Sequence, residues 1–162
     1  MGNVPTSTIG QKTLEAQPIL FIRRSIAWEE IPDTIADCLG TIAAHCQLAG
    51  ISIAGHPFSR YASAGTQGLT IEVGMPLAAP AEAAGEIEAG ILQAGPVIVA
   101  VHAGGYEGLQ DTYQAIERWA KERGHHSGGP FWESYLTDPE EHPDPADWRT
   151  EVFWPIAHQT QL

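Results

Sequence analysis

The chain has 162 residues and a formal net charge of −12, with 20 acidic side chains against 8 lysines and arginines. This charge argues against a nucleic-acid-binding groove, which needs basic side chains to displace phosphate counterions, and it favours a cation as charged partner. No apolar run approaches the ~20 residues of a membrane span, and no signal pattern opens the chain. We therefore expect a cytoplasmic protein with no membrane association.

The first part of the chain predicts a strand, a helix and two further strands. Residues 1–17 are polar and predict a flexible tail, and a buried strand follows over 18–22. Apolar residues at helical spacing predict a helix over 31–48, with Pro32 in its first turn and Gly50 at its exit. Short strands are expected over 57–62 and 69–75, before an Ala- and Pro-rich linker over 75–85.

The second part of the chain predicts the same order of elements. A short strand over 87–92 precedes the strongest strand of the sequence, 96–102. A helix over 107–122 carries an apolar stripe that includes Tyr113 and Trp119. Strands over 131–136 and 151–156 flank an acidic, proline-rich loop over 138–147.

The two parts also match residue by residue. A shift of 74 positions lays Phe58 on Trp132 and Tyr61 on Tyr135, and a shift of 79 lays Glu72 on Glu151. We therefore predict an α+β fold, a domain over 18–158 that is internally duplicated. Its strand-helix-strand-strand halves, 18–77 and 96–156, would be related by a pseudo-two-fold axis. Two helices would cover one side of an antiparallel sheet, and the uncovered faces would form a ligand cleft between the halves.

Glu133 is the most unusual residue of the expected strand 131–136, because aromatic and aliphatic side chains surround it in the sequence. Strand alternation places Glu133 and Tyr135 on one face and Trp132 on the other, where we expect Trp132 to pack beneath a helix. Burial of Glu133 would raise its pKa, which suits either a counter-charge for a cation or a general acid/base. The alternative is a surface glutamate on a half-exposed strand.

Other candidate ligand-binding residues follow from the repeat. Tyr135 and Tyr61 would pack on a ligand and orient it with their hydroxyls, or they would be core tyrosines. Trp28 and Tyr106 each follow a strand and could line the two ends of the cleft. Two further candidates are Ser59, which stands where the other half has Glu133, and Gly74, which would leave room for a ligand.

Other side chains predict structure and not chemistry. Glu72 and Glu151 correspond by the repeat and could flank the cleft, but we favour a salt bridge at a strand end for each. The histidines show no metal-ligand spacing, and no phosphate-binding glycine loop is present, so we expect neither a metal nor a cofactor. Cys38 and Cys46 predict no disulfide framework.

Three segments carry a resemblance to a known family: Val101–Tyr106, Trp132–Pro139 and Glu151–Ile156. Together with the helix that contains Trp119, they resemble the GyrI-like small-molecule-binding family, whose fold also serves as the effector-binding domain of AraC- and MerR-type regulators. The resemblance covers roughly 18–156. It implies an aromatic cleft around a buried glutamate, which falls on Glu133, with the family's strand tyrosine on Tyr135.

The resemblance also implies a function. Multidrug-sensing members of the family bind lipophilic cations at the glutamate, some free-standing members hydrolyse cyclopropane-bearing genotoxic natural products, and others antagonise DNA gyrase. We expect a free-standing member that binds hydrophobic, cationic or electrophilic molecules, as a sensor or by sequestration in drug resistance. One alternative is a hydrolase in which Glu133 and Tyr135 are catalytic and activate water. Another is an acidic inhibitor of a macromolecule such as DNA gyrase, acting through the 138–147 loop.

The sequence departs from the regulators of this family before Pro18. No helix-turn-helix precedes this residue, so we expect no direct nucleic-acid binding by the chain. A separate regulator, or a second copy of the chain, is a candidate partner.

Overall fold

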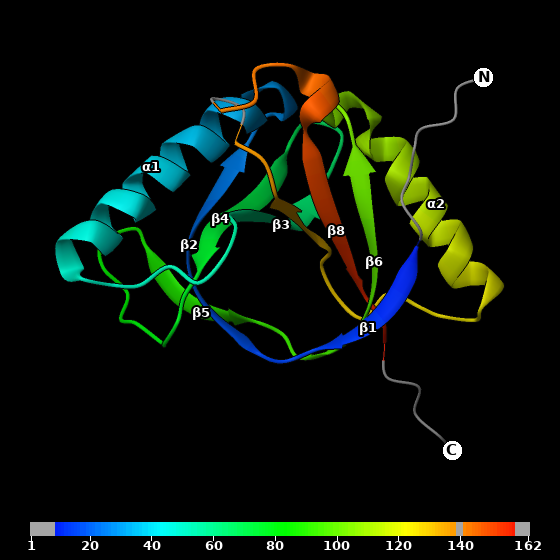
Figure 1. Cartoon of the computed structure of the whole chain (residues 1–162), viewed down its shortest axis with the longest axis horizontal. Helices are drawn as coiled ribbons and strands as arrows, with labels where there is room; N and C mark the ends of the chain where they lie inside the picture. The colour runs from blue at the N-terminus through cyan, green and yellow to red at the C-terminus, as the bar shows by residue number, and fades with distance from the viewer. Residues whose placement is uncertain (1–8, 139–140, 158–162) are drawn as a thin grey trace. The chain divides into compact units, whose positions relative to one another are not determined.

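The structure is a computed structural model that describes residues 9–138 and 141–157. The chain forms two compact units, and Figure 1 labels both helices and most of the strands. The first unit comprises residues 15–94, and the second comprises residues 1–14 and 95–162. Residues 1–8 of the predicted tail lie outside the described residues.

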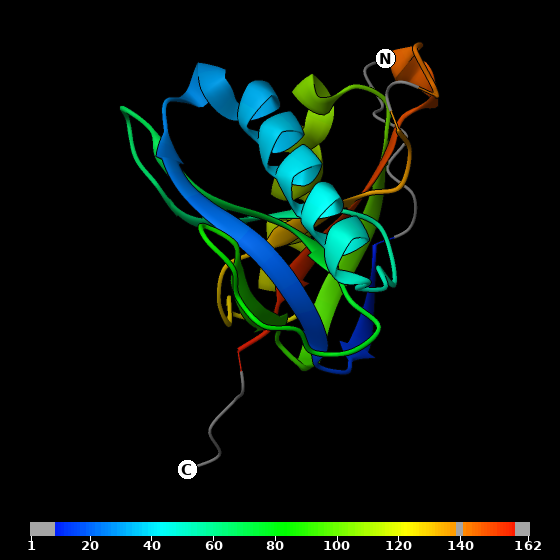
Figure 2. The ribbon, with the colours of Figure 1, turned by 90° about the vertical axis from the view of Figure 1, so that its left-hand side faces the viewer.

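The first unit is a four-stranded antiparallel sheet with one helix on one face. Its strands pair in the order β3-β4-β2-β5. The helix α1 packs against β2 and β4, and Figure 2 looks onto α1 with β2 beside it. The elements are β2 (Gln17–Ile26), the 3-10 helix η1 (Trp28–Glu30), α1 (Ile31–Ala49), β3 (Phe58–Ala64), β4 (Leu69–Pro76) and β5 (Glu88–Leu92).

The two ends of α1 agree with the sequence. Pro32 lies in the first turn, and Gly50 closes the helix with φ +70°, a left-handed conformation that favours glycine. The buried side is formed by Thr34, Cys38, Ile42 and Cys46, and both cysteines are free.

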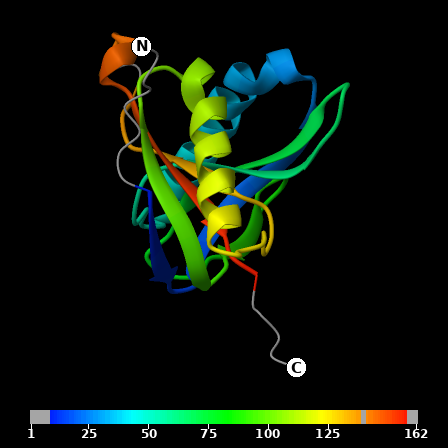
Figure 3. The same cartoon turned by 90° about the vertical axis from the view of Figure 1, so that its right-hand side faces the viewer.

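The second unit is built in the same way. Its strands pair antiparallel in the order β7-β8-β6-β1, and α2 packs against β6, as Figure 3 shows. Tyr113, Trp119 and Phe131 flank the core under α2. The elements are β1 (Gly10–Leu14), β6 (Gly95–Ala103), the 3-10 helix η2 (Tyr106–Gly108), α2 (Leu109–Glu122), β7 (Trp132–Tyr135), the 3-10 helix η3 (Pro145–Asp147) and β8 (Arg149–Pro155).

The predicted α+β class is confirmed, because both units combine antiparallel strands with a separate helix. The order strand, helix, strand, strand recurs in β2-α1-β3-β4 and in β6-α2-β7-β8. The duplication with its pseudo-two-fold axis and the cleft between the halves stay predictions. Within the described part of the chain, no helix is long and apolar enough to cross a membrane.

Two predictions about strands are wrong. Gly10–Leu14, expected in a flexible tail, form β1 and pair with β6 from Gly10↔Val99 to Leu14↔Gly95. The strand expected to end at Ile22 continues to Ile26, because Arg23 and Arg24 pair with β4. A short polar edge strand has no apolar alternation that would reveal it in the sequence.

The favoured salt-bridge role of Glu72 is supported. Its carboxylate is only 5% exposed on β4, between Arg23 of β2 and Arg60 of β3 in the strand register. Arg23 Nη2 lies 2.7 Å from Oε2, and Arg60 Nε lies 2.6 Å from Oε1. Both guanidinium groups also lie over the Phe21 ring. Through its two ion pairs, the Glu72 carboxylate joins β2, β3 and β4.

Replacing this carboxylate should therefore destabilise the protein. We expect Glu72→Gln to lower the free energy of unfolding by about 1.5–3 kcal/mol, because bonds between charged groups become bonds to a neutral amide. The matched control is Glu88→Gln: Glu88 is partly exposed, lies 3.6 Å from Arg23, and should contribute less than about 0.5 kcal/mol. Urea unfolding of both variants tests this, and equal effects would contradict it.

Candidate functional site

The register of β7 and β8 shows which face of the second unit carries Glu133. Glu133 pairs with Val152 and Trp132 pairs with Phe153, and directly paired residues point to the same face. Val152 belongs to the core beneath α2, so Glu133 lies on the helix-covered face. Trp132 instead stacks on Phe153, with ring centroids 5.2 Å apart. The expectation that Trp132 packs beneath a helix is therefore wrong, and Glu133 does not lie on an uncovered face.

Two phenol groups hold the Glu133 carboxylate. The side chain is 4% exposed, so the alternative of a surface glutamate is excluded. Tyr135, two residues along β7, donates its hydroxyl to Oε1 at 2.8 Å. Tyr113 of α2 donates its hydroxyl to Oε2. Hydrogen bonds to an ionised carboxylate are about twice as strong as neutral ones, so these phenols both orient and stabilise its charge.

A row of aromatic rings adjoins this carboxylate. The Tyr106 ring meets the Tyr135 ring edge-on at a centroid distance of 5.8 Å, and its centroid lies 4.8 Å from that of Trp148. The Tyr113 ring lies 4.6 Å from the Phe131 ring, measured between centroids. Glu133 is thus hydrogen-bonded to two tyrosines whose rings pack against further aromatic side chains.

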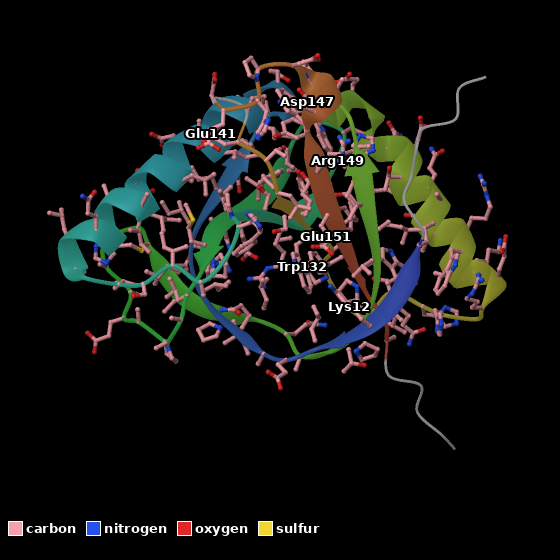
Figure 4. The ribbon with its side chains drawn as sticks, viewed as in Figure 1. Lys12, Trp132, Glu141, Asp147, Arg149 and Glu151 are labelled. Carbon is pink, nitrogen blue, oxygen red and sulfur yellow. The ribbon has the colours of Figure 1, made fainter. Side chains whose placement is uncertain are left out.

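Trp148 is positioned by the loop that returns to β8. Its indole Nε1 donates to the carbonyl of His142 at 2.6 Å. The Arg149 guanidinium donates to the carbonyls of Ala146 and Trp148 at 3.1 and 2.8 Å. Figure 4 labels Arg149 and Asp147 in this segment. Because side chains bind its backbone carbonyls, the loop holds the Trp148 ring beside Tyr106.

His102 positions two of the tyrosines. The ring is buried, with Nε2 2.8 Å from the Gly105 carbonyl and Nδ1 2.9 Å from the Thr112 hydroxyl. A carbonyl only accepts, so Nε2 carries a proton, and Nδ1 shares a hydrogen bond with the Thr112 hydroxyl, which can donate or accept. Gly105 precedes Tyr106 and Thr112 precedes Tyr113, so the imidazole ties both segments to β6. It therefore has a structural role in the second unit.

The other face of the second unit carries a different set of side chains. Lys12 of β1 lies 3.6 Å from Glu151 of β8, and its ammonium lies 5.5 Å from the centroid of the Phe153 ring. Figure 4 labels Lys12, Glu151 and Trp132. The ion pair supports the salt-bridge role favoured for Glu151.

The predicted site residues divide between the two units. The structure brings Glu133, Tyr135 and Tyr106 together in the second unit. In the first unit, Trp28 is partly exposed and donates its indole Nε1 to the Gly65 carbonyl at 2.9 Å, and Tyr61 packs against the core beneath α1. Ser59 is buried on β3. The binding roles of Trp28, Tyr61 and Ser59 stay predictions.

Gly74 has a packing reason within its own unit. A Cβ at this position would meet the Leu20 carbonyl oxygen, and it would lie 2.9 Å from both Phe21 Cβ and Phe58 Cζ. The space above the glycine is therefore filled by neighbouring residues of the same unit. Its predicted role of leaving room for a ligand stays untested.

Three residues of the site were not predicted as such from the sequence. The sequence predicts Tyr113 in the apolar stripe of the helix over 107–122. The missed signal is its hydroxyl, because a buried tyrosine hydroxyl needs a polar partner, here on the facing strand. Trp148 follows an irregular loop with no periodicity to place it. For His102 the sequence indicates only that it lacks metal-ligand spacing, and nothing in it predicts the hydrogen bonds of the ring. Among the described residues, no group of three or more His, Cys, Asp or Glu side chains could hold a metal ion.

The family of the chain follows from its sequence match. The model of the GyrI-like small molecule binding domain matches residues 8–157. The chain belongs to the GyrI-like family. A comparison with curated proteins found no match to the chain.

Solved structures share the fold of this GyrI-like chain. The EcmrR C-terminal domain is 17% identical with a TM-score of 0.81, and the match covers 92% of this chain and 96% of that one. A Listeria innocua hydrolase encoded by lin2189 is 10% identical with a TM-score of 0.65, covering 91% of each chain. SAV2435 bound to tetraphenylphosphonium is 12% identical with a TM-score of 0.60, covering 93% and 94%. The chain spans 58% of the EcmrR chain in its DNA complex.

The site makes one prediction at alkaline pH. Burial of the Tyr106 phenol, together with the charges of Glu133 and Asp138, raises its pKa. The folded state therefore retains this proton above about pH 10, the ordinary pKa of tyrosine, and the associated stability is lost as pH rises through the raised pKa. Tyr106→Phe should lose less stability than the wild type as pH rises above about 10. Urea unfolding measures this, and parallel curves would contradict it.

Proposed function

We propose that this GyrI-like protein binds hydrophobic aromatic cations, with Glu133 as their counter-charge, as a sensor or by sequestration. The arrangement of Glu133 carries the proposal: a carboxylate that is 4% exposed is held by the hydroxyls of Tyr113 and Tyr135. Burial of a carboxylate costs free energy that a protein recovers when the charge has a partner. A bound cation supplies such a partner.

The neighbouring rings favour the same class of ligand. Tyr106, Tyr135 and Trp148 form a connected aromatic group next to the carboxylate. An aromatic face attracts a cation by about 0.5–2 kcal/mol, and it also provides apolar surface for the rest of an aromatic ligand. The net charge of −12 raises the local concentration of cations around the whole chain.

Family membership supports the proposal from a separate direction. The family is one of small-molecule-binding domains, and the structure of SAV2435, which shares the fold, contains tetraphenylphosphonium. This ion combines one delocalised positive charge with four aromatic rings. It is therefore a suitable probe of the site around Glu133.

The proposal predicts a charge-selective effect of Glu133→Gln. The amide keeps the shape of the side chain but removes the charge; its oxygen accepts from one phenol, and its NH2 group donates to the other phenol oxygen. We expect tetraphenylphosphonium to bind at least about tenfold more weakly, equivalent to 1.4 kcal/mol. Triphenylphosphine oxide, a neutral molecule with three of the four rings, should bind within about twofold of its wild-type affinity. Isothermal titration calorimetry measures both.

The control for this experiment is Glu122→Gln. Glu122 is a solvent-exposed carboxylate at the end of α2, so the substitution makes the same change in net charge away from the site. It should leave both affinities unchanged. Equal weakening of the cation and the neutral compound by Glu133→Gln would exclude the counter-charge role.

A second function, hydrolysis, is favoured by the 2.8 Å hydrogen bond between Tyr135 and Glu133. Glu133 would accept a proton from water as the water oxygen bonds to a cyclopropane carbon. The ring C–C bond would break, and its electron pair would pass to the substrate's conjugated carbonyl, which Tyr135 protonates. Glu133 would then return a proton to Tyr135 along their hydrogen bond. General acid–base assistance of this kind contributes typically 10²–10⁴-fold.

Mass spectrometry distinguishes hydrolysis from binding alone. If the protein is a hydrolase, incubation with a cyclopropane-bearing conjugated ketone should give a ring-opened product that is heavier by one water. Glu133→Gln should abolish this product, and Glu122→Gln should retain it. Demonstrable binding without turnover above buffer would rule out the hydrolase.

A further inference from the structure

Thr150 carries a buried hydroxyl that the fold does not use. The residue lies on β8 with 0% of its surface exposed. Within residues 9–138 and 141–157, its Oγ1 has no hydrogen-bond partner. A buried hydroxyl without a partner costs free energy relative to its hydrated state. The second unit would therefore gain stability from an apolar side chain of the same shape.

The strand register places this hydroxyl in the layer of Glu133. Thr150 is paired with Tyr135 of β7 on one side and with His102 of β6 on the other. Side chains that are directly paired share a face and lie about 4.5–5.5 Å apart at Cβ. Glu133 and Val152, each two residues away along their strands, share that face too. Thr150 therefore projects to the helix-covered side, next to the tyrosine that holds Glu133.

The first unit shows what packing alone accepts at this position. Its strands β3 and β4 pair Ser59 with Val73 and Tyr61 with Ile71, as β7 and β8 pair Glu133 with Val152 and Tyr135 with Thr150. The counterpart of Thr150 is thus Ile71, which is fully buried in the apolar core beneath α1. At this position the first unit carries an aliphatic β-branched residue, and the second unit, where Glu133 lies nearby, carries a hydroxyl. Ser59, which matches Glu133, also has a buried hydroxyl without a partner among the described residues, so the comparison concerns the Thr150 position alone.

We propose that the Thr150 hydroxyl is a hydrogen-bonding contact for the molecule that Glu133 binds. A hydroxyl both donates and accepts, so it would recognise a hydroxyl, carbonyl or amino group on an aromatic cation. Glu133 provides affinity for the positive charge, and Thr150 selects cations that carry such a substituent. The inference rests on the proposed function and specifies its ligand class: aromatic cations with a polar substituent bind more tightly than purely hydrocarbon ones.

The test compares tetraphenylphosphonium with its three analogues that carry one hydroxyl at the 2-, 3- or 4-position of one ring. The wild type should bind at least one analogue about three- to tenfold more tightly than the parent ion, as one net hydrogen bond provides. Thr150→Val should remove this preference while keeping the affinity for the parent within about twofold, and Thr150→Ser should retain the preference. The matched control is Thr70→Val, which removes a hydroxyl that already has a partner, Ser25 Oγ at 3.0 Å.

The stability of the free variants provides an independent readout. Thr150→Val should leave the thermal midpoint unchanged or raise it, because it removes a buried hydroxyl without a partner. A lowered midpoint would show that the hydroxyl serves the fold and would overturn the inference. Equal loss of parent and hydroxylated ions in Thr150→Val would overturn it as well, as would an unchanged preference. If the wild type bound none of the phosphonium ions, the proposed function would fail together with the inference.

Discussion

The phenol–carboxylate hydrogen bonds at Glu133 connect the two elements on which the site is built. One donor, Tyr135, lies on the same strand as Glu133, and the other, Tyr113, lies on the helix that covers it. Because the strand and the helix place their side chains on one carboxylate, its orientation depends on the packing of α2. His102 extends this dependence to β6 by binding the segments just before Tyr106 and Tyr113. The site is therefore a property of the whole second unit.

The two units use one arrangement of strands for different purposes. Beneath α1, Ile71 and Val73 belong to an apolar core, and the buried carboxylate Glu72 on the other face is neutralised by arginines. Beneath α2, the matching strands carry Glu133, Tyr135 and Thr150. Buried polar groups often lower the free energy of unfolding relative to apolar ones, and natural proteins retain them mainly at functional sites. The proposed function assigns ligand contact to the second unit because the carboxylate and its two phenol donors lie there.

The sequence allowed most elements and the central carboxylate to be predicted, because strand alternation and helical periodicity are local patterns. Alternation correctly separated Glu133 and Tyr135 from Trp132. It could not show which of the two faces α2 covers, since that depends on packing between distant segments. For the same reason Tyr113 was placed in an apolar stripe, although its ring does pack there and only its hydroxyl reaches Glu133. The strand β1 was missed because its pairing with β6 joins residues far apart in the chain.

The pairing of Leu14 with Gly95 makes the first unit an insertion in the second. All of residues 15–94 emerge from a ribosome before β6 exists, so the first unit can fold early around contacts of its own. The unit that carries Glu133 cannot complete its sheet until β6 and β8 have been synthesised, and β1 remains without its partner strand in the meantime. Long-range pairings of this kind slow folding, because loop closure costs entropy before the contacts form. The unit that carries Glu133 can thus complete its sheet only after residues 15–94 have been synthesised.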